Sequence, residues 1–118
     1  MIIEDDPDTI ELLQVILELR GYDPIPAEGG VTGLRLLREK GADLILLDLM
    51  MDDMDGWAVL ETVKADERLC PIPVIIVSVK HELEDLPRMK AHADQYVSYI
   101  VKPFTVRGLL SEIEGVLS

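Results

Sequence analysis

Two kinds of apolar segment alternate along this chain, and the alternation constrains the fold more strongly than any other feature of the sequence. Short continuous runs, such as LILL at 44–47 and VIIV at 74–77, are typical of parallel strands that are covered on both faces. Longer segments in which apolar residues recur every three or four positions are typical of helices with one buried face. The predicted strands are 2–3, 22–27, 44–47, 74–77 and 99–101, and the predicted helices are 7–20, 31–40, 57–65, 83–93 and 106–117.

Strand–helix alternation predicts an α/β fold in which parallel strands are joined by right-handed crossovers, a doubly wound three-layer sandwich. The second strand is predicted at an edge of the sheet, because Pro24 and Pro26 each lack an amide donor. A length of 118 residues suits one domain of ordinary size, and the chain contains no linker or repeat. We therefore expect residues 1–118 to form a single domain.

Composition excludes several classes of function. The chain has 11 Lys and Arg against 23 Asp and Glu, a formal net charge of −12, and such a surface repels the phosphate backbone of nucleic acids. A single cysteine, Cys70, excludes an internal disulfide framework and a thiolate cluster for a metal. No apolar run approaches the roughly 20 residues that span a bilayer, and the acidic start is unlike a signal peptide. We expect a cytoplasmic protein that binds neither nucleic acid nor membrane.

Polar groups follow four of the five predicted strands at the same end. Ligands of such sheets bind where the strands end, near the switch in strand order. Carboxylates crowded together destabilise a fold unless something neutralises them, and an all-oxygen set of ligands suits Mg²⁺ or Mn²⁺. The sequence therefore predicts a site at this edge that gathers Glu4, Asp5, Asp48, Ser78 and Lys102, and whose carboxylates would bind a divalent cation. Asp6, the next acid, is more simply explained as a helix N-terminal residue that the macrodipole favours.

Four strings, IIEDDPD, LILLDLMMDDMDGW, PVIIVS and YIVKPFT, occur in this order over nearly the whole chain. Together they resemble the receiver domain of bacterial two-component response regulators. The resemblance implies a flavodoxin-like (βα)₅ fold with strand order 2-1-3-4-5. It also implies a signalling switch that accepts a phosphoryl group from a sensor histidine kinase or a phosphotransfer protein, not a conventional enzyme. Its only chemistry would be self-catalysed phosphoryl transfer to and from Asp48.

The same resemblance assigns the metal and acceptor residues. Asp48 matches the aspartate that accepts the phosphoryl group, and its carboxylate would act as the nucleophile. Glu4 and Asp5 match the acidic pair that positions Mg²⁺, and Met50 would add its backbone carbonyl. Phosphoryl transfer depends on positioning and charge neutralisation more than on covalent chemistry, which explains why these residue types are needed.

The resemblance also assigns a switch. Ser78 and Lys102 match the hydroxyl and the ammonium that contact the phosphoryl oxygens, and Tyr99 matches the aromatic residue that turns inward when Ser78 moves. The output would be the surface formed by the fourth helix, the fifth strand and the fifth helix, which could also mediate a homodimer. The Lys102–Pro103 peptide is cis in this family, so we expect it here.

Asp52 and Val79 depart from the family pattern. Asp52 stands where proline is common, so the loop after Asp48 should be more acidic and less rigid. Val79 replaces a small residue and should narrow access to Asp48, and Lys80 could cover the same path. A module of this fold that binds partners without phosphorylation therefore remains the alternative.

Other readings fit the residues less well. A haloacid-dehalogenase-like phosphatase needs an acid where Met50 stands, and a calcium-binding EF-hand loop needs one where Thr62 stands. His81 and His92 lack ligand partners at useful spacing, so we expect solvated or capping roles for them. Trp57 is expected to pack partly in the core.

Overall fold

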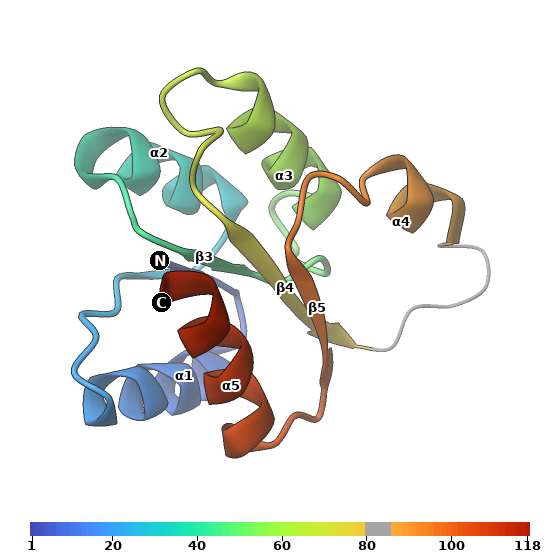
Figure 1. The fold of residues 1–118 in the computed structure, drawn as a ribbon. Coiled ribbons are helices and arrows are strands. Elements are labelled where there is room, and N and C mark those ends of the chain that lie inside the picture. Colours follow the sequence, from blue (N-terminus) through green and yellow to red (C-terminus); the bar gives the residue numbers. More distant parts are fainter. Residues whose placement is uncertain (80–85) are drawn as a thin grey trace.

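The computed structural model describes residues 1–79 and 86–118, and strands and helices alternate along them (Figure 1). The predicted helix at 83–93 appears from residue 86 onward, because 80–85 lie outside the described residues. The elements are β1 (Ile2–Ile3), α1 (Pro7–Leu19), β2 (Pro26–Ala27), α2 (Gly30–Lys40), β3 (Ile45–Leu47), α3 (Gly56–Ala65), β4 (Val74–Val79), α4 (Leu86–Ala91), β5 (Ser98–Lys102) and α5 (Val106–Leu117).

The five strands form one parallel sheet in the order β2-β1-β3-β4-β5. This confirms the predicted doubly wound α/β fold of the flavodoxin-like type. The second strand lies at an edge as predicted, but only Pro26–Ala27 pair with β1. Residues 22–25 precede the paired residues, and among them the Ile25 carbonyl accepts from the Ile2 amide at 2.8 Å.

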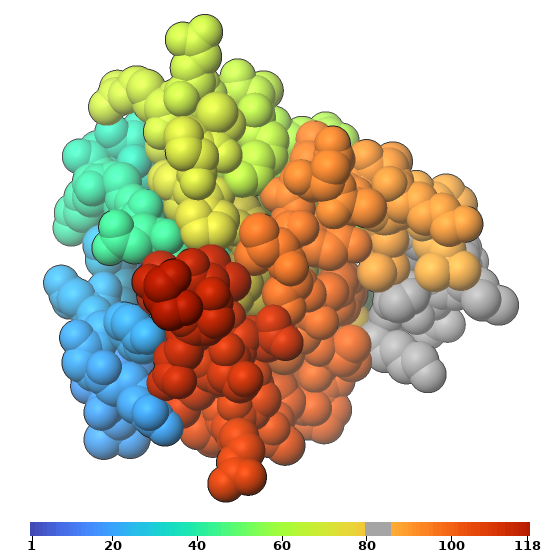
Figure 2. All heavy atoms as spheres, viewed as in Figure 1, coloured from blue at the N-terminus to red at the C-terminus, as the bar shows by residue number. Residues whose placement is uncertain are grey.

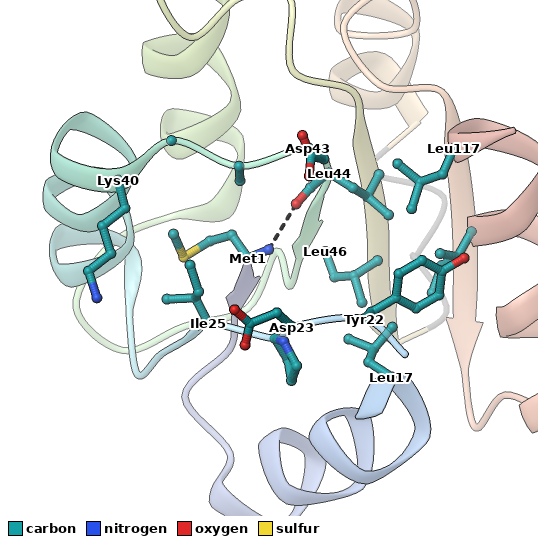
Figure 3. Close-up of a pocket in the computed structure, with 14 residues that line it drawn as sticks. Met1, Leu17, Tyr22, Asp23, Ile25, Lys40, Asp43, Leu44, Leu46 and Leu117 are labelled. Atoms are coloured by element: carbon teal, nitrogen blue, oxygen red, sulfur yellow. Dashed lines mark hydrogen bonds between the residues drawn. The ribbon is translucent and has the colours of Figure 1, made fainter. Parts of the chain in front are cut away.

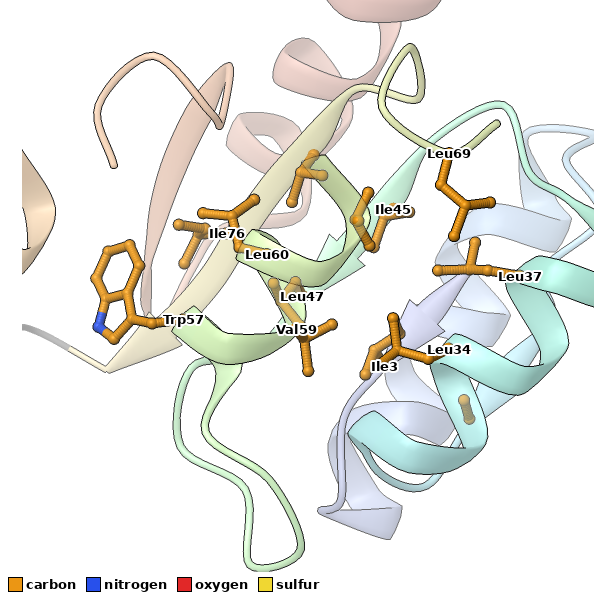
Figure 4. Packing of buried hydrophobic residues seen from close by; sticks show 13 residues of the cluster. Ile3, Leu34, Leu37, Ile45, Leu47, Trp57, Val59, Leu60, Leu69 and Ile76 are labelled. Carbon is orange, nitrogen blue, oxygen red and sulfur yellow. The ribbon is translucent and has the colours of Figure 1, made fainter. Parts of the chain in front are cut away.

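Residues that alternate along the strands fill two hydrophobic layers. One layer lies between the sheet and helices α2 and α3, and contains Leu34 and Leu37 of α2, Val59 and Leu60 of α3, and Leu47 of β3 (Figure 4). The other layer contains Leu13 and Ile16 of α1 with Leu109 and Ile113 of α5. Complete burial of one such side chain contributes about 2 kcal/mol, so both faces hold the sheet in place.

Helices α1 and α5 cover the second face side by side. Figure 2 shows the side chains of α5, in red, filling the space between α1 and β5. An ion pair joins the two helices at the surface, with Arg20 Nη1 3.1 Å from Glu114 Oε1. No helix within the described residues is long and apolar enough to cross a membrane.

Helix α1 begins at Pro7 and Asp6 occupies its N-cap position. The Asp6 carboxylate does not bond a backbone amide there; it accepts a hydrogen bond of 2.6 Å from the Thr9 hydroxyl. Asp55 does form such a cap on α3, since its carboxylate accepts from the Trp57 amide at 2.8 Å.

His92 packs in the interface between α3 and the segment after α4. The expectation of a solvated role is wrong, whereas the bond from its ring to the Arg88 carbonyl in the last turn of α4 fits the expected capping role. Its ring is buried and stacks on Trp57 with centroids 4.8 Å apart. Nε2 lies 2.7 Å from Glu61 Oε1 and Nδ1 lies 2.7 Å from the Arg88 carbonyl. Burial lowers the pKa of His92, but these two bonds outweigh it and the net pKa is raised. His81 lies outside the described residues.

A cavity of about 370 Å³ opens at the amino ends of the strands (Figure 3). Residues 22–25 and 40–44 line it, and the Met1 ammonium donates to the Leu44 carbonyl across it at 2.9 Å. Burial lowers the pKa of that ammonium. The carboxyl ends of the strands, where the predicted site residues lie, are at the opposite edge of the sheet.

Candidate functional site

The register of the sheet brings the polar strand ends together. Ile3 pairs with Leu47, so the residues that follow them, Glu4 and Asp48, lie next to each other where β1 and β3 end. Val79 pairs with Lys102, the last residue of β5. Because the strands are parallel and adjacent, these side chains converge on one edge although they are far apart in sequence.

Three carboxylates form a cluster at this edge. One oxygen from each of Glu4, Asp5 and Asp48 lies within 4.8 Å of the others. Glu4 is 3% exposed and Asp48 is 5% exposed, whereas Asp5 is half-buried. Hard oxygen ligands that share a small volume suit a divalent cation such as Mg²⁺, so the donor set fits the cation that the sequence predicts.

Lys102 supplies the positive charge inside the cluster. Its Nζ lies 2.8 Å from Glu4 Oε2 and 3.6 Å from Asp48 Oδ2. The peptide between Lys102 and Pro103 is cis. One ammonium against three carboxylates leaves an excess of negative charge, which a divalent cation would neutralise.

Two donors orient the Asp48 carboxylate. The Ser78 hydroxyl donates to Oδ1 at 2.7 Å, and the Met50 amide donates to the same oxygen at 3.2 Å. Ser78 is 1% exposed, so water does not compete for this bond. Oδ1 is therefore held on one side of the carboxylate while Oδ2 faces Lys102.

The loop between β3 and α3 is anchored at several points. The Asp52 amide donates to Asp5 Oδ2 at 3.0 Å, and the Asp53 carboxylate accepts from the Gly30 and Val31 amides of α2 at 3.1 Å each. The acidic loop expected to be less rigid is thus tied to two other segments. The sequence signal for this anchor is Gly29 and Gly30 at the start of α2, because the N-cap residue Gly29 has no side chain to bond the first amides of the helix.

Tyr99 lies in β5 beside the site. Its hydroxyl donates to the Val79 carbonyl at 3.1 Å, and its ring packs edge-on against Tyr96 at 6.3 Å between centroids. Val79 itself is 47% exposed. Lys80, expected to cover the path to Asp48, lies outside the described residues.

The pKa of Glu4 is shifted by its surroundings. Burial raises its pKa to about 7, against the hydrogen bond from Lys102, which lowers it, and the charge of Asp48 adds to the rise. The metal-free site therefore gains a proton on Glu4 more easily than an exposed glutamate would.

Without divalent cations, we expect the stability of the wild type to fall relative to Glu4→Gln as the pH rises. The pKa of Glu4 lies near 7 in the folded state against an ordinary value of 4.5, so the folded state binds more protons between these values and loses stability as they leave. Urea unfolding in EDTA between about pH 5 and pH 8 should show a relative change of about 3 kcal/mol. The exposed Glu11→Gln is the control, and a difference independent of pH would contradict this expectation.

Comparison with known proteins points to one family. The protein-family model described as the response regulator receiver domain matches residues 1–114. The DNA-binding dual master transcriptional regulator RpaA of Synechocystis is 35% identical over 118 residues, which are 99% of this chain and 48% of that protein. The heme response regulator HssR of Staphylococcus aureus is 32% identical over 117 residues, 99% of this chain and 50% of that protein. The chain spans about half the length of these curated relatives.

Solved structures agree with this similarity. The signal receiver domain of a histidine kinase from Syntrophus aciditrophicus has a TM-score of 0.89 at 32% identity, and covers 98% of this chain and 86% of that one. The N-terminal domain of a response regulator receiver protein from Methanoculleus marisnigri has a TM-score of 0.78 at 36% identity, with 99% and 94% covered.

Proposed function

Because this chain belongs to the response regulator receiver family, whose domains are signalling switches and not conventional enzymes, we propose that Asp48 accepts a phosphoryl group and thereby switches the domain. The observation that carries the proposal is the state of Asp48 itself. Its carboxylate is buried, is oriented by Ser78 and the Met50 amide, and lies beside Lys102. A carboxylate with no role would not be held at a strand end by two donors and a cation.

The phosphoryl donor is a phosphohistidine of a sensor kinase or a phosphotransfer protein. An Asp48 oxygen attacks phosphorus, the bond to the imidazole nitrogen breaks, and an acyl phosphate forms. Lys102 then pairs with the phosphoryl oxygens as a compact point charge. Mg²⁺ held by Glu4, Asp5, Asp48 and the Met50 carbonyl would neutralise the charge on those oxygens.

The switch begins at Ser78. Its hydroxyl donates to Asp48 Oδ1 at 2.7 Å before phosphorylation, and it changes its acceptor to a phosphoryl oxygen afterwards. The neighbouring Val79 carbonyl accepts from the Tyr99 hydroxyl at 3.1 Å, so a shift of Ser78 and Val79 would be transmitted to Tyr99. Because the contact of Ser78 with a phosphoryl oxygen exists only in the phosphorylated state, it shifts the conformational equilibrium of the surface formed by α4, β5 and α5. A partner or a second copy of the chain would bind to that surface.

Residues outside the acceptor set tune the rates. The exposed Val79 side chain narrows the approach to Asp48, and the Asp52 carboxylate adds negative charge that attracts cations and repels an incoming phosphoryl group. Lys80 is proposed for the same role from its place in the sequence.

We propose that residues 1–118 act as one receiver domain in the cytoplasm, and that nucleic acid is not bound by this acidic surface.

The test is covalent labelling of Asp48. Wild type incubated with Mg²⁺ and a small-molecule phosphodonor should gain the mass of one phosphoryl group, and beryllofluoride should be bound at the same site. Asp48→Asn should abolish both signals, while Asp23→Asn, an exposed acid at the opposite edge of the sheet, should keep them. Wild type that takes no label from any donor would favour the alternative, a binding module that works without phosphorylation.

A further inference from the structure

The carboxylate of Asp53 lies in the loop before α3 but bonds a different helix. Its Oδ1 accepts from the Gly30 amide and its Oδ2 from the Val31 amide, both at 3.1 Å. These amides begin α2, where Gly29 holds the N-cap position and has no side chain to offer them. The positive end of the helix dipole also favours a carboxylate at this place. One side chain therefore fastens the loop to α2.

The same loop carries the groups that complete the acceptor site. The Asp52 amide, directly before Asp53, donates to Asp5 Oδ2 at 3.0 Å, and the Met50 amide donates to Asp48 Oδ1 at 3.2 Å. The loop closes at its base, where the Gly56 amide donates to the Leu49 carbonyl at 3.0 Å. The position of the Asp52 amide therefore depends on where Asp53 is anchored.

We propose that Asp53 is a positioning residue of the acceptor site. By clamping the loop to α2, it orients Asp5 and the Met50 carbonyl toward the divalent cation, and so sets the concentration of Mg²⁺ at which Asp48 is phosphorylated. This inference rests on the proposed function and assigns it a residue that neither contacts the phosphoryl group nor binds the cation.

Gly29 provides an independent way to disturb the clamp. A Cβ at Gly29 would lie 2.6 Å from Asp53 Oδ2 and 2.7 Å from Oδ1. The φ angle of Gly29 is 177°, an extended conformation that any residue adopts. The three atoms nearest to the added Cβ all belong to the Asp53 carboxylate, which leaves no room for a side chain. Gly29→Ala therefore displaces the carboxylate without changing the charge of the protein.

The experiment measures Mg²⁺ binding by calorimetry, and phosphorylation by a small-molecule donor as Mg²⁺ is varied. Asp53→Ala and Gly29→Ala should each weaken Mg²⁺ affinity about tenfold, while the rate at saturating Mg²⁺ changes much less. Asp53→Asn keeps one acceptor oxygen and should be intermediate. The double variant should be no worse than Asp53→Ala, because the new methyl group enters space that the carboxylate has left.

Two control variants distinguish the loss of the Asp53 clamp from a change in net charge and from a general loss of stability. Glu28→Gln removes one negative charge beside Gly29, and Glu28 is exposed and makes no hydrogen bond within the described residues. Ile113→Val removes a methylene group from the fully buried layer under α5, which lowers stability away from the loop. Both variants should bind Mg²⁺ with wild-type affinity.

The inference is overturned if Asp53→Ala binds Mg²⁺ as tightly as Glu28→Gln does, or if the effects of Gly29→Ala and Asp53→Ala simply add. Wild type that binds Mg²⁺ but accepts no phosphoryl group would contradict the proposed function, while the comparison of Mg²⁺ affinities would still decide the role of Asp53. Wild type without Mg²⁺ affinity would overturn both.

Discussion

Lys102→Ala is expected to lower the stability of the metal-free protein by about 3 kcal/mol at slightly alkaline pH, because it leaves buried carboxylates without their cation. Glu4 and Asp48 are both almost completely buried, and Lys102 Nζ lies 2.8 Å and 3.6 Å from their oxygens. Phosphorylation of Asp48 should slow about a hundredfold, the usual effect of removing one group that stabilises charge in a transition state.

The loss of stability should depend on conditions in a defined way. The pKa of Glu4 is about 7 in the wild type, where Lys102 lowers it, so it should lie higher in the variant. Lowering the pH then removes one of the unpaired charges, and Mg²⁺ supplies another neutralising group. In denaturant unfolding, both treatments should reduce the difference in the free energy of unfolding between Lys102→Ala and wild type. Lys102→Arg should recover most of the stability but little of the rate, because a planar guanidinium does not replace a compact ammonium. Lys40→Ala, at an exposed position, is the control. A difference in the free energy of unfolding between Lys102→Ala and wild type that changes with neither pH nor Mg²⁺ would contradict the electrostatic account.

Gly56→Ala is expected to destabilise the fold by about 3 kcal/mol or more, near the upper end for an overpacked position. A Cβ on Gly56 would lie 2.4 Å from the Leu49 Cα and 2.5 Å from the Asp48 carbonyl oxygen. Both are backbone atoms, so no side-chain rotation relieves the clash. The loop would have to move away from α3, and the main chain of the acceptor residue with it.

Two measurements check this expectation. Urea unfolding should show the fall in stability, and labelling of Asp48 by a phosphodonor should fall at temperatures where the variant is still folded. Gly115→Ala is the matched control, since a Cβ there meets no atom within 4 Å and alanine suits a helix better than glycine does. If the Gly56→Ala protein were as stable as wild type, the close approach of Gly56 to the main chain of Asp48 and Leu49 would not be required for the stability of the fold.

The arrangement of the acidic cluster could be predicted from the sequence, and the anchoring of the loop that supports it could not. Glu4 and Asp48 each follow an apolar strand directly, and parallel strands place such residues at one edge whatever the details of packing. Asp52 and Asp53 are two adjacent acids of the same type. Nothing local tells which one bonds α2 through its side chain and which one holds Asp5 through its amide.

His92 illustrates the same limit. Its sequence neighbours are polar or small, which favours an exposed position. In the structure its ring stacks on that of Trp57, a residue more than thirty positions earlier in the chain, with 4.8 Å between the ring centroids. That contact depends on how α4 lies against α3, and the periodicity of each helix specifies only which side it buries.

The sequence by itself therefore determined the class of fold, the order of its elements and the edge where the chemistry gathers, because hydrophobic periodicity and strand polarity act over a few neighbouring residues. The tertiary structure alone decided the anchoring of the loop by Asp53, the close approach at Gly56 and the burial of His92. These depend on ångström-scale distances between elements remote in sequence, which many packings of the same pattern would change.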